Sequence, residues 1–526
     1  MDPVAGNILF YTVTIGIMLL LYRYSKYAFG MLLGLWTYLG VVVYLSFGLD
    51  TLHQVTLYHI LPLTVLNLLC FLVWDGFPSN SIPKQYKVRL GSFTIQNLQR
   101  GVSIIGSSGS GKTESVVYGL LKHLNKHQFP GVIHDYKHFE ITEMAYPMFK
   151  DSDIPFHVVS FDDIHKKVNP IAPRYLPDAE SVNEISRVLL ENLLEQRESM
   201  THGSSKFFND AVEGLLGGLI WKLKTEFPEH CTLPHLMATF QYLKRDQLMA
   251  FLESDFTSKA MADAFLSGVD SERQTAGVMS TLANALKKIS TERIFMALSA
   301  DEVPLDINNP KNPAVIAIVN NPKFETAYSP VIATILHTIT KQMGVRGRTP
   351  SFLLMEEAPT IRLLNMHRIP ATLRSYDITT IYILQDKIQN DMMYGEKGSR
   401  AILSNLSYQF FGKANDPETA KYYERFFEIV KRPTRSVSKS SNWKFDTRVT
   451  KGEKEVSKLR ADLFFRLRPG EFVAFGDGKD KRIQFPRPEI IRGLPDAKVK
   501  PDHADIRANY KTVHLKVQEL FESRKW

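Results

Sequence analysis

The stretch that decides the fold is residues 102–113, which read VSIIGSSGSGKT. Its first four residues form a short apolar run of the kind that makes a buried strand. Its last eight residues, 106–113, match the pattern GxxxxGK followed by Ser or Thr. Apolar residues then recur at helical spacing, so the loop is predicted to connect a strand to a helix: Val116, Val117, Leu120, Leu121 and Leu124.

A loop in this position is typical of proteins that bind the phosphates of a nucleotide. Its glycines let the backbone wrap closely around phosphate and point N–H groups inward, and the start of the helix adds partial positive charge. Lys112 is predicted to reach the β- and γ-phosphates of ATP, and Thr113 to ligate Mg²⁺. The predicted nucleotide-binding residues are Gly106, Ser107, Ser108, Gly109, Ser110, Gly111, Lys112 and Thr113.

Such a loop works with a carboxylate at the end of another strand of the sheet. Residues 352–357, which read FLLMEE, fit this role best because a buried apolar run ends in two acids. Glu356 is predicted to enter the Mg²⁺ shell through water, and Glu357 to orient and polarise the attacking water. Asp135, which ends the apolar run 131–135, is the rival acid and is assigned a supporting role.

Two more residues are candidates for a role in ATP hydrolysis. Gln385 ends the apolar run 378–385 and is predicted to sense the γ-phosphate or to position water; the alternative is a polar cap on the strand. Arg374 is a candidate arginine finger, which stabilises transition-state charge from a neighbouring subunit. The alternative for Arg374 is an ordinary solvated surface residue.

Between residues 178 and 300 the strand signal fades and amphipathic helical patterns replace it. An all-α region is therefore predicted between the phosphate-loop half and the acidic-strand half of an α/β domain. A helical composition assigns no function by itself. A lid, a substrate reader and a subunit contact all remain open.

The first 80 residues contain three uncharged apolar stretches, 5–22, 27–49 and 55–74. About 20 such residues cross a bilayer, so three membrane spans are predicted. The alternative for the third is a hydrophobic helix that lies against the other two. With the amino terminus outside, the flanking basic groups lie on the cytoplasmic side, together with everything after residue 80. These groups are Arg23 and Lys26 before the second span, and Lys84, Lys87 and Arg89 after the third.

The net charge of +9 is concentrated in one segment. Residues 431–460 contain ten Lys or Arg and three Asp or Glu, a net of +7 (10 − 3). The segment is interpreted either as a solvated loop or as a loop that holds a nucleic-acid strand, with Trp443 and Phe445 stacking on bases. The two cysteines, Cys70 and Cys231, provide no disulfide framework and no metal spacing.

The order of these motifs resembles the type IV secretion coupling proteins, the TraD/TraG-like conjugative DNA-transfer ATPases. The resemblance runs from the membrane anchor to about residue 485. Besides the phosphate loop and the acidic strand it covers Asp135-Tyr-Lys137, where the family commonly has Asp-Pro-Lys, together with residues 168–171 (VNPI), 393–395 (MYG), 415–420 (NDPETA) and 466–473 (RLRPGEFV). Two features depart from the family: Glu356 replaces the usual Asp, and three spans replace the more familiar two.

The resemblance implies a RecA-like P-loop NTPase domain with an inserted all-α domain and an N-terminal transmembrane anchor. It implies a hexameric ring with ATP sites between subunits, with Arg374 as the finger and Gln385 in the site. The implied partners are single-stranded DNA bound without sequence preference, a relaxase, the secretion channel and the bacterial inner membrane. The expected domains are 1–80 (anchor), 81–177 with 301–495 (RecA-like), 178–300 (all-α) and 496–526 (tail).

Three other functions remain open at this stage. The chain is alternatively an ATPase that recruits protein substrates to a secretion channel, or a membrane receptor that binds nucleotide without hydrolysing it. A DNA pump of the FtsK/HerA kind shares the same fold, although the helical insertion argues against it.

Overall fold

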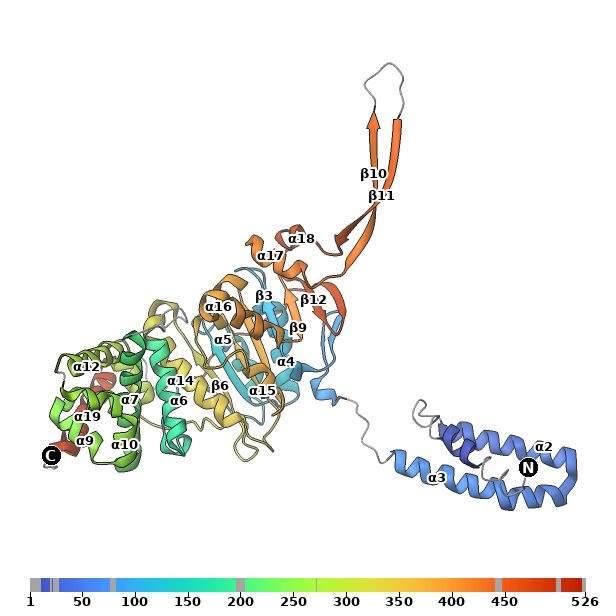
Figure 1. Cartoon of the computed structure of the whole chain (residues 1–526), viewed down its shortest axis with the longest axis horizontal. Helices are drawn as coiled ribbons and strands as arrows, with labels where there is room; N and C mark the ends of the chain where they lie inside the picture. Colours follow the sequence, from blue (N-terminus) through green and yellow to red (C-terminus); the bar gives the residue numbers. More distant parts are fainter. Residues whose placement is uncertain are drawn as a thin grey trace. The chain divides into compact units, whose positions relative to one another are not determined.

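The computed structural model describes residues 11–18, 21, 28–75, 82–194, 204–270, 272–439, 447–497 and 503–522 (Figure 1). The chain divides into two compact units, Met1–Pro83 and Lys84–Trp526. The division falls close to residue 80, where the predicted membrane anchor ends.

The N-terminal unit contains α2 (Ala28–Val55), a wide helical turn (Thr56–Ile60) and α3 (Leu61–Asp75). The described residues include one helical stretch long and apolar enough to cross a membrane, Ala28–Leu69. The backbone leaves the helical conformation at Gly48 (φ 85°, ψ −175°), and the chain folds back so that the Asn67 side chain donates to the Phe29 carbonyl at 3.4 Å. The sequence predicted separate spans over 27–49 and 55–74. Half of the first predicted span, 5–22, lies outside the described residues, and the three-span arrangement stays a prediction.

The C-terminal unit is built on one sheet. Within the described residues, nine strands pair in the order β13-β12-β9-β3-β8-β7-β4-β6-β5. The parallel strands are apolar runs buried on both faces, as crossover connections require: β3 (Val102–Ile105), β4 (Gly131–Asp135), β5 (Phe156–Val159), β6 (Val315–Val319), β7 (Ser351–Met355), β8 (Ile378–Leu384) and β9 (Tyr408–Phe411). Antiparallel β12 (Glu471–Gly476) and β13 (Lys479–Gln484) close one side. The strands predicted from the apolar runs are confirmed.

Helices cover both faces of the sheet, and a small hairpin precedes it. The covering helices are α4 (Tyr118–Lys126), α5 (Glu140–Phe149), α14 (Glu325–Met343), α15 (Ile369–Arg374), α16 (Lys387–Ser404), α17 (Pro417–Glu424) and α18 (Ala461–Phe465). The hairpin consists of β1 (Val88–Leu90) and β2 (Phe93–Ile95). Two large apolar clusters result, one on each face.

The region between β5 and β6 is helical, as predicted. Its helices are α6 (Ala179–Leu193), α7 (Ser204–Glu226), α8 (Leu233–Tyr242), α9 (Arg245–Glu253), α10 (Phe256–Met261), α11 (Asp263–Leu266), α12 (Glu272–Lys287) and α13 (Glu292–Leu298). Their apolar core is continuous with one face of the sheet. The insertion therefore shares its core with the sheet, which ties the two together mechanically.

The chain end is part of this helical region. The sequence predicted a tail over 496–526. The structure has α19 (His503–Glu522) in this segment, and α19 packs against α8 and α13. Phe521 anchors it, with its ring centroid 5.2 Å from that of Phe251 and 5.5 Å from that of Phe227.

The basic segment 431–460 forms a hairpin, and the expectation of a loop was wrong. Strands β10 (Ile429–Lys439) and β11 (Thr447–Ser457) pair antiparallel along their full length as a long two-stranded ribbon (Figure 1). The segment carries Val, Ser and Thr between its charges, and backbone pairing between its two halves overrode the loop-like composition. Trp443 and Phe445 lie outside the described residues.

Candidate nucleotide site

The phosphate-loop motif lies between β3 and the helical turn Thr113–Val117 that leads into α4. Gly109 (φ 72°) and Gly111 (φ 84°) both adopt backbone conformations that favour glycine. A Cβ at Gly111 would lie 2.7 Å from the backbone nitrogen of Gly470. That nitrogen donates to the Ser110 carbonyl at 2.9 Å, so the loop before β12 holds the phosphate loop in shape.

Lys112 is buried and folds back over its own loop. Its Nζ donates to the Gly106 carbonyl at 2.5 Å and to the Ser107 carbonyl at 3.4 Å. Burial lowers the pKa of Lys112, while the charges of Glu357 and Glu356 act in the opposite direction and that of Lys137 adds to the lowering. The phosphate loop and the two glutamates therefore belong to one electrostatic cluster.

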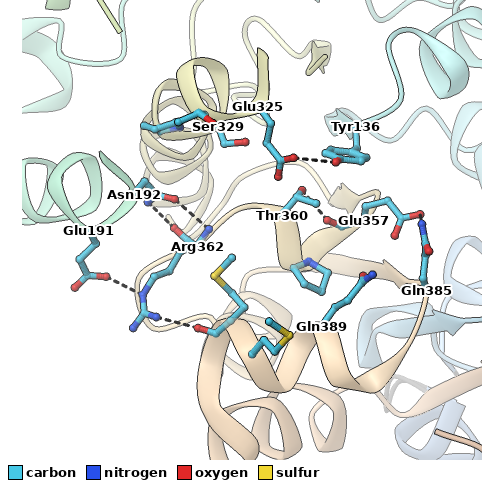
Figure 2. Close-up of a pocket in the computed structure, with 15 residues that line it drawn as sticks. Tyr136, Glu191, Asn192, Glu325, Ser329, Glu357, Thr360, Arg362, Gln385 and Gln389 are labelled. Carbon is cyan, nitrogen blue, oxygen red and sulfur yellow. Dashed lines mark hydrogen bonds and ion pairs between the residues drawn. The ribbon is translucent and has the colours of Figure 1, made fainter. Parts of the chain in front are cut away.

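Glu356 and Glu357 follow directly after β7, and both are at most 2% exposed. Glu356 Oε2 accepts a hydrogen bond from the Tyr136 backbone N–H at 3.1 Å. Glu357 Oε1 accepts one from the Gln385 side chain at 3.1 Å (Figure 2). Burial, followed by the nearby charge of Asp135, raises the pKa of Glu356 to about 8. Three of the predicted residues, Glu356, Glu357 and Gln385, are thus brought together at one edge of the sheet.

Lys137 is the residue of this site to which sequence reasoning assigned no role. It follows β4, and its Nζ lies 3.3 Å from Glu356 Oε1, 3.2 Å from Glu357 Oε1 and 3.8 Å from Glu140 Oε2. Although burial lowers the pKa of Lys137, the charges of Glu356 and Glu357 raise it above its usual value. The sequence did contain a signal for Lys137, because the residue follows by two positions the end of a predicted strand that ends in an acid.

Asp135 supports the site from within the core. Its Oδ2 accepts hydrogen bonds from the Thr142 backbone N–H at 2.7 Å and from the Thr142 hydroxyl at 2.6 Å. Burial raises the pKa of Asp135 to about 6, and the two hydrogen bonds from Thr142 oppose that shift. The carboxylate thereby fixes the start of α5 against the end of β4.

Arg374 is far from the other predicted residues. It is exposed at the end of α15, just before β8 begins, whereas Gln385 follows the last residue of β8. The seven residues of β8 separate the two by roughly 20 Å at the usual strand rise. Within one chain, Arg374 and the phosphate loop occupy opposite edges of the sheet.

A cavity of 470 Å³ adjoins Glu357 and Gln385 and extends toward the helical region (Figure 2). Arg362 closes one end of it. Its Nε donates to Glu191 at 3.1 Å, its Nη1 donates to the Met393 carbonyl at 2.9 Å, and its backbone exchanges hydrogen bonds with the Asn192 side chain at 2.9 and 3.1 Å. The loop that carries Glu357 is therefore attached to the end of α6.

The side-chain oxygens at this edge of the sheet suit a metal ion that takes most of its ligands from phosphate oxygens and water rather than from the protein. In the described part of the chain, no cluster of three or more His, Cys, Asp or Glu is arranged to hold a metal ion by itself. Several residues at this edge nevertheless have a buried oxygen without a hydrogen-bond partner, namely Ser110 Oγ, Asp135 Oδ1 and Glu357 Oε2, and the contact of Glu356 Oε1 is the Lys137 ammonium at 3.3 Å. This pattern fits Mg²⁺, which commonly uses one or two protein carboxylates together with phosphate oxygens and waters.

Solved structures of one bacterial protein share this fold. The plasmid coupling protein TrwB in complex with the ATP analogue ADPNP superposes with a TM-score of 0.62 at 13% identity, covering 80% of this chain and 93% of that one. The unbound TrwB lacking its N-terminal segment gives 0.62 at 13%, and the complex with ADP and Mg²⁺ gives 0.61 at 12%, each covering 79% of this chain and 92% of the other. No curated protein sequence matches the chain.

The sequence model of one protein family matches residues 78–480, which is well over half of the chain. The match includes the phosphate loop, the acidic strand end, the helical insertion and the β10–β11 hairpin. The chain belongs to the type IV secretory system conjugative DNA transfer family.

Proposed function

We propose that the chain is a membrane-anchored ATPase that couples a DNA substrate to a type IV secretion channel and drives its transfer. The observation that carries this proposal is that the phosphate loop, Gln385 and the Glu356–Glu357 pair follow three adjacent parallel strands, β3, β8 and β7, and so lie at one edge of the sheet. A loop that only bound phosphate would not need two buried carboxylates beside it. A hydrolase does need them, because one acid polarises water while the cofactor's metal is held nearby.

The proposed cofactors are ATP and Mg²⁺. The backbone N–H groups of residues 106–113 would bind the phosphates. The Lys112 ammonium, which contacts carbonyls of its own loop in this structure, would turn toward the phosphates. Thr113 and Glu356 would hold Mg²⁺, which neutralises charge on the phosphate oxygens. Solved complexes of TrwB with an ATP analogue, and with ADP and Mg²⁺, support this assignment by analogy.

Glu357 is proposed to orient the attacking water, and Gln385 to position Glu357. The hydrogen bond between them at 3.1 Å supports this division of roles. Because Glu356 is one methylene longer than an Asp, its Oε2 reaches the Tyr136 backbone N–H. This contact favours a water-mediated role for Glu356 at the metal.

Arg374 is proposed to act on the nucleotide of a neighbouring copy in a ring, which we propose to be a hexamer. An arginine at the opposite edge of the sheet cannot reach its own phosphate loop, so its catalytic use requires a second subunit. The proposed domains are the anchor 1–80, the RecA-like 81–177 with 301–495, the all-α 178–300, and a C-terminal segment 496–526 that adds α19 to the helical region.

The β10–β11 hairpin is proposed to contact single-stranded DNA without reading its sequence. The segment 431–460, which forms most of this hairpin, carries a net charge of +7. Lys and Arg side chains neutralise DNA phosphates, so this charge favours a phosphate backbone as the partner. We further propose that the chain binds a relaxase and components of the channel, and that it lies in the bacterial inner membrane as a multi-pass protein.

The test is ATP hydrolysis by the full chain in detergent, with and without single-stranded DNA, beside Lys112→Ala, with assembly state measured in the same samples. DNA-stimulated turnover that disappears in Lys112→Ala supports the proposal. Hydrolysis by an assembled ring that ignores DNA would favour an ATPase that recruits protein substrates. An assembled ring that binds ATP without hydrolysing it would indicate a receptor.

A further inference from the structure

The Lys137 ammonium lies between the carboxylates of Glu356 and Glu357. It is within 3.3 Å of one oxygen from each carboxylate. The two oxygens come from consecutive residues after β7, and the ammonium comes from the segment after β4, the neighbouring strand. One positive group therefore bridges two carboxylates that would otherwise repel each other inside the protein.

The surroundings supply more negative than positive charge. Glu356 and Glu357 are buried, Asp135 is fully buried behind them, and Glu140 lies 3.8 Å from the same ammonium. Paired carboxylates of this kind are costly to bury without compensating positive charge. Lys137 supplies part of that compensation, and Lys112 lies within the same cluster.

The contacts of Lys137 leave room for a different cation. Glu357 Oε2 is buried and accepts no hydrogen bond, and the contact of Glu356 Oε1 is the Lys137 ammonium at 3.3 Å. Lys137 itself is 29% exposed at its side chain, whereas the two carboxylate side chains are 2% exposed. The ammonium therefore has a path to move aside, and the carboxylates do not.

We infer that Lys137 is a positioning residue that acts as the resident counter-cation of Glu356 and Glu357 when no nucleotide is bound, and that Mg²⁺ arriving with nucleotide displaces it. The inference rests on the proposed function, because it takes Glu356 to be the carboxylate on the metal side. It explains how two adjacent buried glutamates keep their geometry between turnovers. It also gives the Lys of the Asp135-Tyr-Lys137 segment a role.

The test uses the full chain in detergent, without nucleotide or DNA, and measures the thermal unfolding midpoint in EDTA and in millimolar Mg²⁺. Wild type is expected to show little response to Mg²⁺, because Lys137 already balances the carboxylates. Lys137→Met, which removes the charge and keeps the length, is expected to have a lower midpoint in EDTA. Mg²⁺ should raise that midpoint by several degrees as it takes the place of the ammonium.

Matched variants show whether the Mg²⁺ response of the unfolding midpoint depends on the charge at position 137 and on the two glutamates. Lys137→Arg keeps a cation and should respond to Mg²⁺ as wild type does, and the exposed Lys150→Met should behave likewise. Adding Glu356→Gln and Glu357→Gln to Lys137→Met should abolish the Mg²⁺ response. If Lys137→Met does not fold, Lys137→Gln, whose amide can donate to one carboxylate, makes the same comparison.

An Mg²⁺ response of Lys137→Met no larger than that of wild type overturns the inference, and so does a response that survives removal of both glutamates. The measurement contains no ATP and no DNA. Its outcome is therefore separate from that of the hydrolysis test, which can fail while Lys137 still balances the two carboxylates.

Discussion

Glu356 and Glu357 are adjacent in the chain but meet different partners. The backbone of Glu357 is left-handed (φ 42°, ψ 51°), which is uncommon for a residue other than glycine. The turn directs Glu356 to the Tyr136 N–H and Glu357 to Gln385, and the Thr360 hydroxyl fixes it by donating to the Glu357 carbonyl at 2.7 Å. Backbone conformations of this kind persist where surrounding contacts determine them, often at functional sites.

Glu357→Gln should separate nucleotide binding from hydrolysis. The amide keeps the size of the side chain but cannot polarise water as a base, so turnover should fall by about 10²–10⁴-fold. ATP affinity should stay close to that of wild type, because the phosphate loop is untouched. Steady-state hydrolysis and equilibrium binding of a fluorescent ATP analogue measure the two effects. Equal losses in binding and turnover would argue that Glu357 mainly supports the fold.

The end of α6 and the loop after β7 act as one element. Asn192 and Arg362 exchange backbone and side-chain hydrogen bonds, and the Arg362 guanidinium joins Glu191 to the Met393 carbonyl (Figure 2). A movement of the Glu357 loop must therefore move α6 or break these bonds. These hydrogen bonds link the helical region to the site, although the helical region contributes none of the predicted catalytic residues.

Arg362→Ala should destabilise the chain and loosen this link. Losing charged hydrogen bonds from a largely buried side chain costs about 1.5–3 kcal/mol of unfolding free energy. Amide hydrogen exchange should quicken in residues 358–366 and at the end of α6. Arg187→Ala is the control, because it removes an ion pair to Glu213 from the same helix at a more exposed place. Unchanged exchange at α6 would show that the two elements are not coupled.

A second prediction about a single structural element concerns the β10–β11 hairpin and its binding to DNA. Replacing Lys431, Arg432, Arg435 and Lys439 with Gln should weaken binding to single-stranded DNA. The salt dependence should become shallower, by about 0.7 in the log–log slope for each DNA phosphate that the hairpin no longer neutralises. Hydrolysis without DNA should be unchanged. Lys122→Gln with Lys126→Gln on α4 removes two charges and is the control for Lys431→Gln with Arg432→Gln, which also removes two; an equal loss of affinity in the two would contradict a specific role for the hairpin.

At the scale of the whole molecule, one chain does not contain a complete site if Arg374 is catalytic. Lys112 and Arg374 lie at opposite edges of the sheet, so a neighbouring copy must supply the arginine. Such an arrangement makes hydrolysis depend on assembly. It also means that two differently defective chains complement each other.

Arg374→Ala should lower turnover by about 10³–10⁵-fold while leaving ATP binding intact. Mixed rings of Arg374→Ala and Lys112→Ala chains should regain activity. Some interfaces in these rings pair an intact phosphate loop with an intact arginine. Hydrolysis measured after co-assembly, against each variant alone, tests this. A mixture no more active than its components would place the function of Arg374 elsewhere.

Local patterns let the sequence determine much of this protein. The GxxxxGK motif, the buried apolar runs and the amphipathic stretches depend on neighbouring residues, so they predicted the strand–loop–helix, the parallel strands and the helical insertion. The same runs ended in Glu356, Glu357 and Gln385. Parallel strands bring such ends to one edge, so their meeting was also predictable.

Only the tertiary structure decided the features that depend on distant partners. Lys137 meets Glu356 across two strands far apart in sequence, and Gly470 supports the phosphate loop from more than 350 residues away. The packing of α19 likewise depends on α8 and α13, which no local window contains, whereas the hairpin at 429–457 is a local pairing that its charged composition did not indicate. Composition described the charge and polarity of these segments, but backbone pairing and burial fixed their conformation.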